Sequence, residues 1–82
     1  MRTRQQALGD RNLVGERVGQ RRRELHIKQK DLLTLLQIQG IDLNASGLSK
    51  LEGQNRFVTD IELKCIAKAL EVSVDWLLGN ME

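Results

Sequence analysis

Apolar residues recur at the three- and four-residue spacing of an amphipathic helix along most of this 82-residue chain, which contains no proline. Val14 and Val18 fall on one face of a helix expected over residues 13–25. A second helix begins near Gln29 and carries a wide apolar stripe, made of Leu32, Leu33, Leu35 and Leu36. Since β-branched residues are sparse, the pattern predicts an all-α fold.

Two further helices have clear starting signals. Asn44 is the expected N-cap of a short helix that ends at Gly53 and Asn55, because its side chain can accept a hydrogen bond from the first turn. Thr59 and Glu62 have the spacing of a capping box, in which each side chain accepts a hydrogen bond from the backbone of the other. The sequence therefore predicts helices that start after Asn44 and after Thr59.

The C-terminal part of the chain is expected to complete the core. The helix after Thr59 carries a predicted buried stripe of Ile61, Cys65, Ile66, Ala69 and Leu70. Within that stripe Cys65 is interpreted as a small core residue and not as a reactive thiol. A last helix starts at Ser73 and ends at Gly79, with Trp76 expected to close the core. Val74 and Leu78 fit either the core or a dimer contact.

Length and composition limit the classes of protein that this chain can belong to. It has the size of one domain, and its single cysteine excludes a disulfide framework and a cysteine-based zinc site. Its apolar runs are far shorter than a membrane span, and no signal-peptide pattern follows Arg2 and Arg4. We expect a cytoplasmic protein with a flexible basic arm over residues 1–12 and one domain over residues 13–82.

Charge is divided unevenly along the chain. Residues 1–30 hold nine basic and three acidic residues, whereas residues 51–82 hold three basic and six acidic ones. Such a division predicts one face that binds an anion, for which nucleic acid is the most common candidate. A solvated basic helix without a partner is the alternative, and the run Arg21–Arg23 by itself does not exclude it.

The helix expected after Asn44 has an outer face of short polar side chains. Leu48 and Leu51 point to one side of it, and the opposite side carries Ala45, Ser46, Ser49 and Lys50. Small hydrogen-bonding groups with a single cation suit close contact with base edges in the major groove of DNA. A short, serine-rich amphipathic helix with no such role is the alternative interpretation.

Three pieces of sequence in this order resemble the Cro/C1-type helix-turn-helix family of repressors, also called the XRE family. They are Gln29 at the start of the second helix, the string Leu48-Ser49-Lys50-Leu51-Glu52, and the string that runs from Ala67 to Leu78. The resemblance covers roughly residues 14–80. It implies a compact five-helix, lambda-repressor-like DNA-binding domain in which the second and third helices form the helix-turn-helix.

The resemblance also implies which residues contact DNA. Those that face the bases are Asn44, Ala45, Ser46, Ser49 and Lys50, and those that bind phosphates are Lys28, Gln29, Lys30, Asn55 and Arg56. By its chemistry Lys50 can donate to guanine, while Ala45 can contact a thymine methyl group. The family pattern further implies a structural ion pair between Arg22 and Glu52.

The chain departs from the family pattern at several positions. Leu33 replaces a small residue early in the second helix, and Arg21 replaces an apolar one. Lys28 replaces the usual helix cap, where its charge opposes the helix macrodipole. Residues 37–42 lengthen the connection to the third helix, so that either the second helix gains a turn or the connection bulges.

These observations predict a sequence-specific transcriptional regulator, with repression of a near-palindromic operator by a dimer as the expected mode. Its expected partners are double-stranded DNA and a second copy of the chain, with no membrane, metal or cofactor. The alternative is a protein-interaction module of the same fold, such as an antitoxin or anti-repressor that binds a regulatory protein. An enzyme is not expected, because the one histidine, His26, falls in a predicted turn and no glycine-rich phosphate loop is present.

Overall fold

The computed structural model describes residues 8–80, and the part of the chain that it describes contains five helices and no strand. They are α1 (Gly15–Glu24), α2 (Gln29–Ile38), α3 (Ala45–Glu52), α4 (Asp60–Leu70) and α5 (Val74–Leu78). The all-α prediction is therefore confirmed. None of the helices between residues 8 and 80 is long and apolar enough to span a bilayer.

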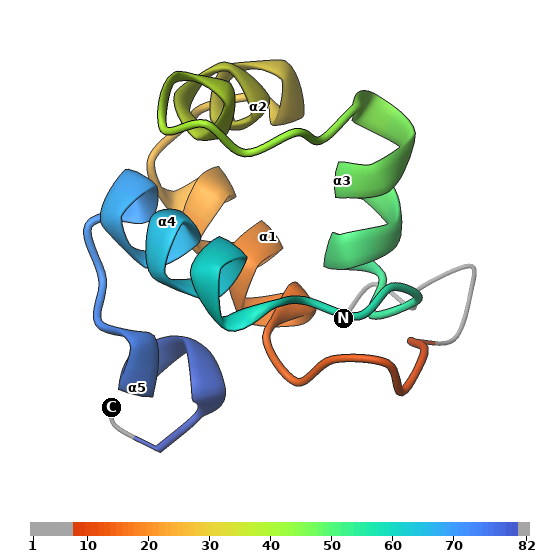
Figure 1. The fold of residues 1–82 in the computed structure, drawn as a ribbon. Coiled ribbons are helices and arrows are strands. Elements are labelled where there is room, and N and C mark those ends of the chain that lie inside the picture. Colours follow the sequence, from red (N-terminus) through yellow and green to blue (C-terminus); the bar gives the residue numbers. More distant parts are fainter. Residues whose placement is uncertain (1–7, 81–82) are drawn as a thin grey trace.

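The helices pack around α1, which contacts both α3 and α4 (Figure 1). α2 lies across the top of the view and contacts α3 and α4, while α5 packs against α4 at the lower left. Every helix contributes a fully buried side chain, and these are Val18, Leu32, Leu36, Leu48, Leu51, Ile66, Leu70 and Leu77. Burial of these aliphatic side chains is the main favourable contribution to folding.

Three predicted helix starts are confirmed by their cap hydrogen bonds. Asn44 Oδ1 accepts from the Gly47 N–H at 2.7 Å. Thr59 Oγ1 accepts from the Glu62 N–H at 3.1 Å, and Glu62 Oε1 accepts from the Thr59 N–H at 3.0 Å. Ser73 Oγ accepts from the Trp76 N–H at 2.9 Å. Each bond satisfies a backbone donor that the helix itself leaves unpaired.

The start of α2 is stabilised by Asp31 in place of a conventional cap. The Asp31 carboxylate accepts from the Lys28 N–H at 2.9 Å. The Lys28 side chain is exposed and, as an ammonium, has no lone pair to offer the helix. The negative charge of a carboxylate in the first turn also interacts favourably with the helix macrodipole. This interaction offsets the unfavourable one of the Lys28 charge.

Some residues expected in the core lie at the surface. Ile61, predicted to be buried, is 67 % exposed, because α4 turns Ile66, Ala67 and Leu70 toward α1 and α2 instead. Likewise α1 begins at Gly15 and not at Leu13, whose side chain is 74 % exposed. Cys65 is half-buried and packs against the core, as interpreted from its position in the stripe.

The stripe of α2 is narrower than predicted. Leu32 and Leu36 are fully buried and Leu33 packs against the core, but Leu35 is 39 % exposed. α2 ends at Ile38, and the connection that follows is tied to its surroundings at two points. The Gln37 amide donates to the Leu43 carbonyl at 3.2 Å, and the Gln39 amide donates to the Cys65 carbonyl at 3.0 Å. Residues 37–42 thus divide between the last turn of α2 and a connection that is anchored by hydrogen bonds.

Residues 9–12, predicted as the end of a flexible arm, are bound to the loop after α3. The Gly9 N–H donates to the Gly53 carbonyl at 2.9 Å, and the Arg11 N–H donates to the Gln54 carbonyl at 3.0 Å. Asn12 joins the two segments further, since its amide donates to the Arg56 carbonyl at 2.8 Å. The structure therefore ties residues 9–12 to the loop after α3, whereas Arg2 and Arg4 lie outside the described residues.

The end of α4 places Glu71 in the left-handed region, with φ 59°. Replacing Glu71 with glycine should raise the free energy of unfolding by about 0.5–1 kcal/mol, because glycine adopts this conformation without steric penalty. Chemical denaturation measures the change. Glu71→Gln separates the effect of charge from that of the backbone. Gln54→Gly is a second control, since Gln54 has φ 61° but its amide donates to Asn12, so no comparable gain is expected there.

Candidate nucleic-acid interface

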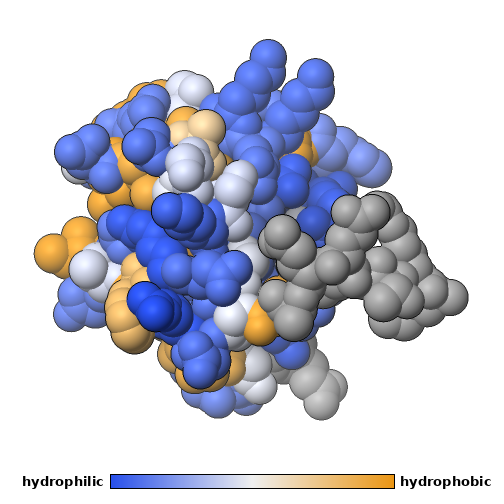
Figure 2. Space-filling view, turned by 90° about the vertical axis from the view of Figure 1, so that its right-hand side faces the viewer, coloured by the Kyte–Doolittle hydropathy of each residue, from blue (hydrophilic) through white to orange (hydrophobic). Residues whose placement is uncertain are grey.

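The outer face of α3 is an exposed polar surface. Its exposed residues are those predicted to face the bases, namely Asn44, Ala45, Ser46, Ser49 and Lys50, while Leu48 and Leu51 are buried beneath them. Figure 2 views the molecule from the side of α3, and this side is mainly hydrophilic, with hydrophobic residues chiefly along its left margin. We call the five exposed residues the α3 face.

The hydrogen bonds of Asn44 restrict what its side chain can offer. Asn44 Oδ1 is already occupied by the Gly47 N–H at the helix start. The amide nitrogen has no hydrogen bond within the described residues, so it is the part of this side chain that can donate outward. Asn44 is exposed on the α3 face, as predicted, but its side-chain oxygen is used to cap the helix.

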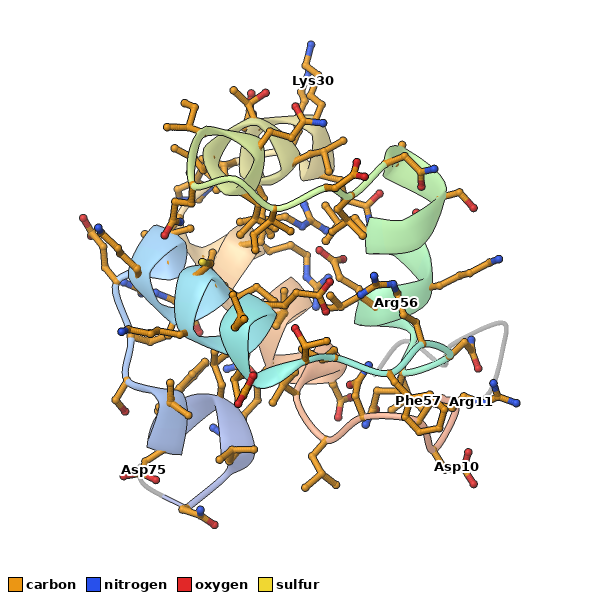
Figure 3. The ribbon with its side chains drawn as sticks, in the orientation of Figure 1. Asp10, Arg11, Lys30, Arg56, Phe57 and Asp75 are labelled. Carbon is orange, nitrogen blue, oxygen red and sulfur yellow. The ribbon has the colours of Figure 1, made fainter. Side chains whose placement is uncertain are left out.

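The residues predicted to bind phosphates lie on two segments beside the α3 face. Lys28 and Lys30 are exposed at the start of α2, and Lys30 projects outward in Figure 3. Asn55 is exposed in the loop after α3. Gln29 is instead half-buried and bonded to two residues of α3, as described below. Exposed cations beside the α3 face suit contact with the phosphates that flank a groove.

Arg56 has an intramolecular partner that the sequence did not indicate. Its Nη1 and Nη2 donate to Glu62 Oε1 and Oε2, each at 3.1 Å. Nη1 also approaches the Phe57 carbonyl at 3.3 Å. Glu62 thus belongs to the capping box of α4 and is also the counter-ion of Arg56, so the predicted phosphate ligand is held against α4.

The predicted pair of Arg22 and Glu52 is present as a bidentate ion pair. Arg22 Nε donates to Glu52 Oε2 at 2.8 Å, and Nη2 donates to Oε1 at 3.1 Å. The two side chains are only 13 % and 9 % exposed. Because a guanidinium and a carboxylate match in this planar geometry, the pair fixes the C-terminal end of α3 on α1.

Gln29 extends this pair from Glu52 to the α3 face. Its Nε2 donates to Glu52 Oε1 at 3.0 Å, and its Oε1 accepts from the Ser49 hydroxyl at 3.2 Å. The four side chains Arg22, Glu52, Gln29 and Ser49 thus form a continuous chain of hydrogen bonds across α1, α2 and α3, which we call the Glu52 network. It joins the start of α2 directly to the surface of α3.

The two candidate dimer residues, for which the sequence left both a core and a dimer role open, pack against the core. Val74 and Leu78 are both half-buried against the core, as is Trp76, whose ring lies 5.0 Å from the Arg17 guanidinium. The apolar side chains that do reach the surface nearby are Leu13, 74 % exposed, and Phe57, 71 % exposed. Sequence analysis missed both, because each lies outside a helix and shows no periodicity.

Leu13 and Phe57 belong to the lining of one cavity, of about 140 Å³, whose wall includes Leu78. The Arg11 guanidinium lies 5.6 Å from the centroid of the Phe57 ring, and Figure 3 shows the two side chains next to each other. Two exposed apolar side chains at one cavity make this place a candidate for contact with another protein.

The described residues contain no group of three or more histidine, cysteine, aspartate or glutamate side chains that could hold a metal ion. His26 is exposed in the turn between α1 and α2, where the sequence placed it.

No protein-family model, curated protein or solved structure matches this chain.

Loss of either partner of the buried pair should destabilise the fold strongly. Arg22→Met and Glu52→Gln should each lower the free energy of unfolding by roughly 2–4 kcal/mol, because each leaves a buried polar group without its partner. The double variant should lose clearly less than the sum of the two, as measured by urea denaturation. Additive losses would show that the two side chains do not interact.

The exposed pair of Arg21 and Glu24 provides a matched control. Its closest nitrogen–oxygen distance is 3.5 Å, and the Glu24 side chain is 47 % exposed. Since solvent screens such a pair, Glu24→Gln should change the free energy of unfolding by less than about 0.5 kcal/mol.

Protonation of the Glu62 carboxylate at acidic pH should lower the free energy of unfolding. Burial raises the pKa of this carboxyl, but hydrogen bonds from Arg56 and from the Thr59 backbone outweigh it and hold the pKa below its ordinary value of 4.5. Its stabilising contribution is therefore complete above pH 4.5 and is lost as the pH falls through the lower pKa of the folded state.

The comparison that tests this uses wild type and Glu62→Gln between pH 3 and about pH 7. The advantage of wild type in free energy of unfolding should shrink as the solution is acidified. In an Arg56→Met background this pH dependence of the free energy of unfolding should be weaker, because the positive charge that pairs with Glu62 has been removed. An advantage that stays constant down to acidic pH would contradict the assignment.

Proposed function

We propose that this chain is a sequence-specific regulator of transcription that binds double-stranded DNA through the α3 face, in the manner of Cro/C1-type helix-turn-helix repressors. Repression is the proposed effect, and the nucleoid in the cytoplasm is the proposed place of action. The observation that carries the proposal is that the α3 face is small, polar and exposed while the Glu52 network braces the helix beneath it.

The size of the side chains on the α3 face supports close approach to bases. Ala45, Ser46 and Ser49 extend little beyond the helix backbone, so α3 can lie deep in a major groove without a steric barrier. Lys50 provides one long cation on the same face, with the reach to meet guanine O6 and N7. A surface helix required only for solubility would carry longer charged side chains here.

The surroundings of α3 support contact with phosphates. Lys28 and Lys30 are exposed at the start of α2, which contacts α3, and Asn55 is exposed after its end. Contacts of this kind provide affinity and orientation without sequence preference. The Glu52 network adds rigidity, and a recognition helix held in one orientation loses less entropy when it binds.

A homodimer on a near-palindromic site is part of the proposal. Leu13 and Phe57 provide an exposed apolar patch close to the loop that follows α3. Two copies joined by a two-fold axis at this patch would present two α3 faces to one side of the DNA. The same patch favours the second candidate, a module that binds a regulatory protein, in which case a stoichiometric partner and not DNA occupies it.

Selection of bound duplexes from a random library, at about physiological ionic strength, tests the proposal. We expect enrichment of one near-palindromic sequence, with affinity that falls steeply with salt by roughly 0.9 in the log–log slope for each phosphate contact. Failure to enrich any sequence would overturn the proposal, and co-purification of one stoichiometric protein would then favour the second candidate.

Three lysine variants should distinguish base contacts from phosphate contacts and from residues outside the interface. Lys50→Ala should lower affinity for the selected site by about 1–3 kcal/mol and change the base preferred at one position, because Lys50 is proposed to read a base. Lys30→Ala should weaken binding to all sequences alike and reduce the salt dependence. Lys68→Ala should leave binding unchanged, since Lys68 is in the last turn of α4 and the C-terminal end of this helix lies away from α3 in Figure 1.

A further inference from the structure

The Glu52 network gives a definite direction to the hydrogen bonds that reach the α3 face. The Glu52 carboxylate, paired with the Arg22 guanidinium at 2.8 and 3.1 Å, can only accept hydrogen bonds. Its neighbour in the network, Gln29, has an amide with one donating and one accepting end. Only the donating end can face a carboxylate, so Gln29 Nε2 is the atom that lies 3.0 Å from Glu52 Oε1.

The orientation of Gln29 determines the orientation of the Ser49 hydroxyl. With Nε2 directed to Glu52, the Gln29 carbonyl oxygen faces Ser49 Oγ at 3.2 Å. This oxygen carries no hydrogen, and therefore the hydroxyl of Ser49 must be the donor. A serine hydroxyl has one hydrogen and two lone pairs, so the exposed side of Ser49 retains acceptor capacity alone.

Ser46 shows by contrast what the network does. Its side chain is also exposed on the α3 face, and within residues 8–80 no hydrogen bond to its hydroxyl is found. The Ser46 hydroxyl can rotate and either donate to a base or accept from one. The two serines thus have the same chemistry but different constraints, because only Ser49 is bonded to Gln29.

We infer that Ser49 reads DNA as an obligatory hydrogen-bond acceptor, and that it contacts the exocyclic amino group of adenine or cytosine. Adenine N6 and cytosine N4 are the donors that the major groove displays, whereas guanine and thymine display acceptors at O6, N7 and O4. An acceptor that faced those atoms would be left unpaired. This inference rests on the proposed DNA function and specifies one contact within it.

The experiment uses the full chain and the duplex selected from the random library. The base that Ser49 contacts is located as the position at which Ser49→Ala loses sequence preference. At that position adenine is replaced by purine, or cytosine by pyrimidin-2-one, which deletes the amino group and keeps the ring. Deletion should weaken binding of wild type by on the order of threefold to tenfold, and should leave binding of Ser49→Ala unchanged.

Two further variants test the role of the network. Ser46→Ala, the matched control, should retain the full effect of amino deletion at this position. Gln29→Met frees the Ser49 hydroxyl to rotate and donate, so the effect of amino deletion should shrink. Replacing a neighbouring purine by its 7-deaza analogue removes an acceptor, and this change should not distinguish wild type from Ser49→Ala.

The outcomes separate this inference from the proposed function. If wild type enriches no sequence, the proposed function fails and the inference fails with it. If wild type enriches a site but amino deletion has the same effect on wild type and on Ser49→Ala, the DNA function stands and the acceptor role of Ser49 is overturned. A 7-deaza effect that disappears in Ser49→Ala would likewise overturn it, since Ser49 would then be a donor.

Discussion

The arrangement of α1, α2 and α3 depends on the carboxylate of Glu52, whose side chain is only 9 % exposed. Removing a charged carboxylate from water is unfavourable unless hydrogen bonds replace the lost solvent. Arg22 from α1 and Gln29 from α2 provide those bonds, at 2.8 to 3.1 Å. Because the three groups come from three helices, the carboxylate is satisfied only when the helices take their observed positions.

The loop that follows α3 is held by a second set of contacts of a different kind, next to the Glu52 network. Residues 9–12 bond to the loop after α3 through backbone atoms and through Asn12, and Arg56 in that loop is paired with Glu62 of α4. One end of the loop is thus fixed by the N-terminal segment and the other by a helix cap. Both sets of contacts hold the C-terminal half of α3 and the loop after it, which limits the entropy that the surface proposed to meet DNA loses on binding.

Several large apolar side chains remain at the surface instead of in the core. Leu13, Phe57 and Ile61 are 67 to 74 % exposed. A domain of this size buries little surface, so burial of each large apolar side chain would add to its stability. Leu13 and Phe57 line one cavity, so their exposure is concentrated at one place on the surface. Such concentration is unfavourable for an isolated molecule and is compensated when a partner covers it.

Sequence alone determined the helices and their caps, because these depend on residues within one helical turn of each other. Asn44, the pair Thr59 and Glu62, and Ser73 all cap as predicted. The ion pair of Arg22 and Glu52 followed from the resemblance to a family. Only the tertiary structure decided the exposure of Ile61, the partner of Arg56 and the binding of residues 9–12. Each of these depends on how distant segments pack, and local periodicity carries no information about that packing.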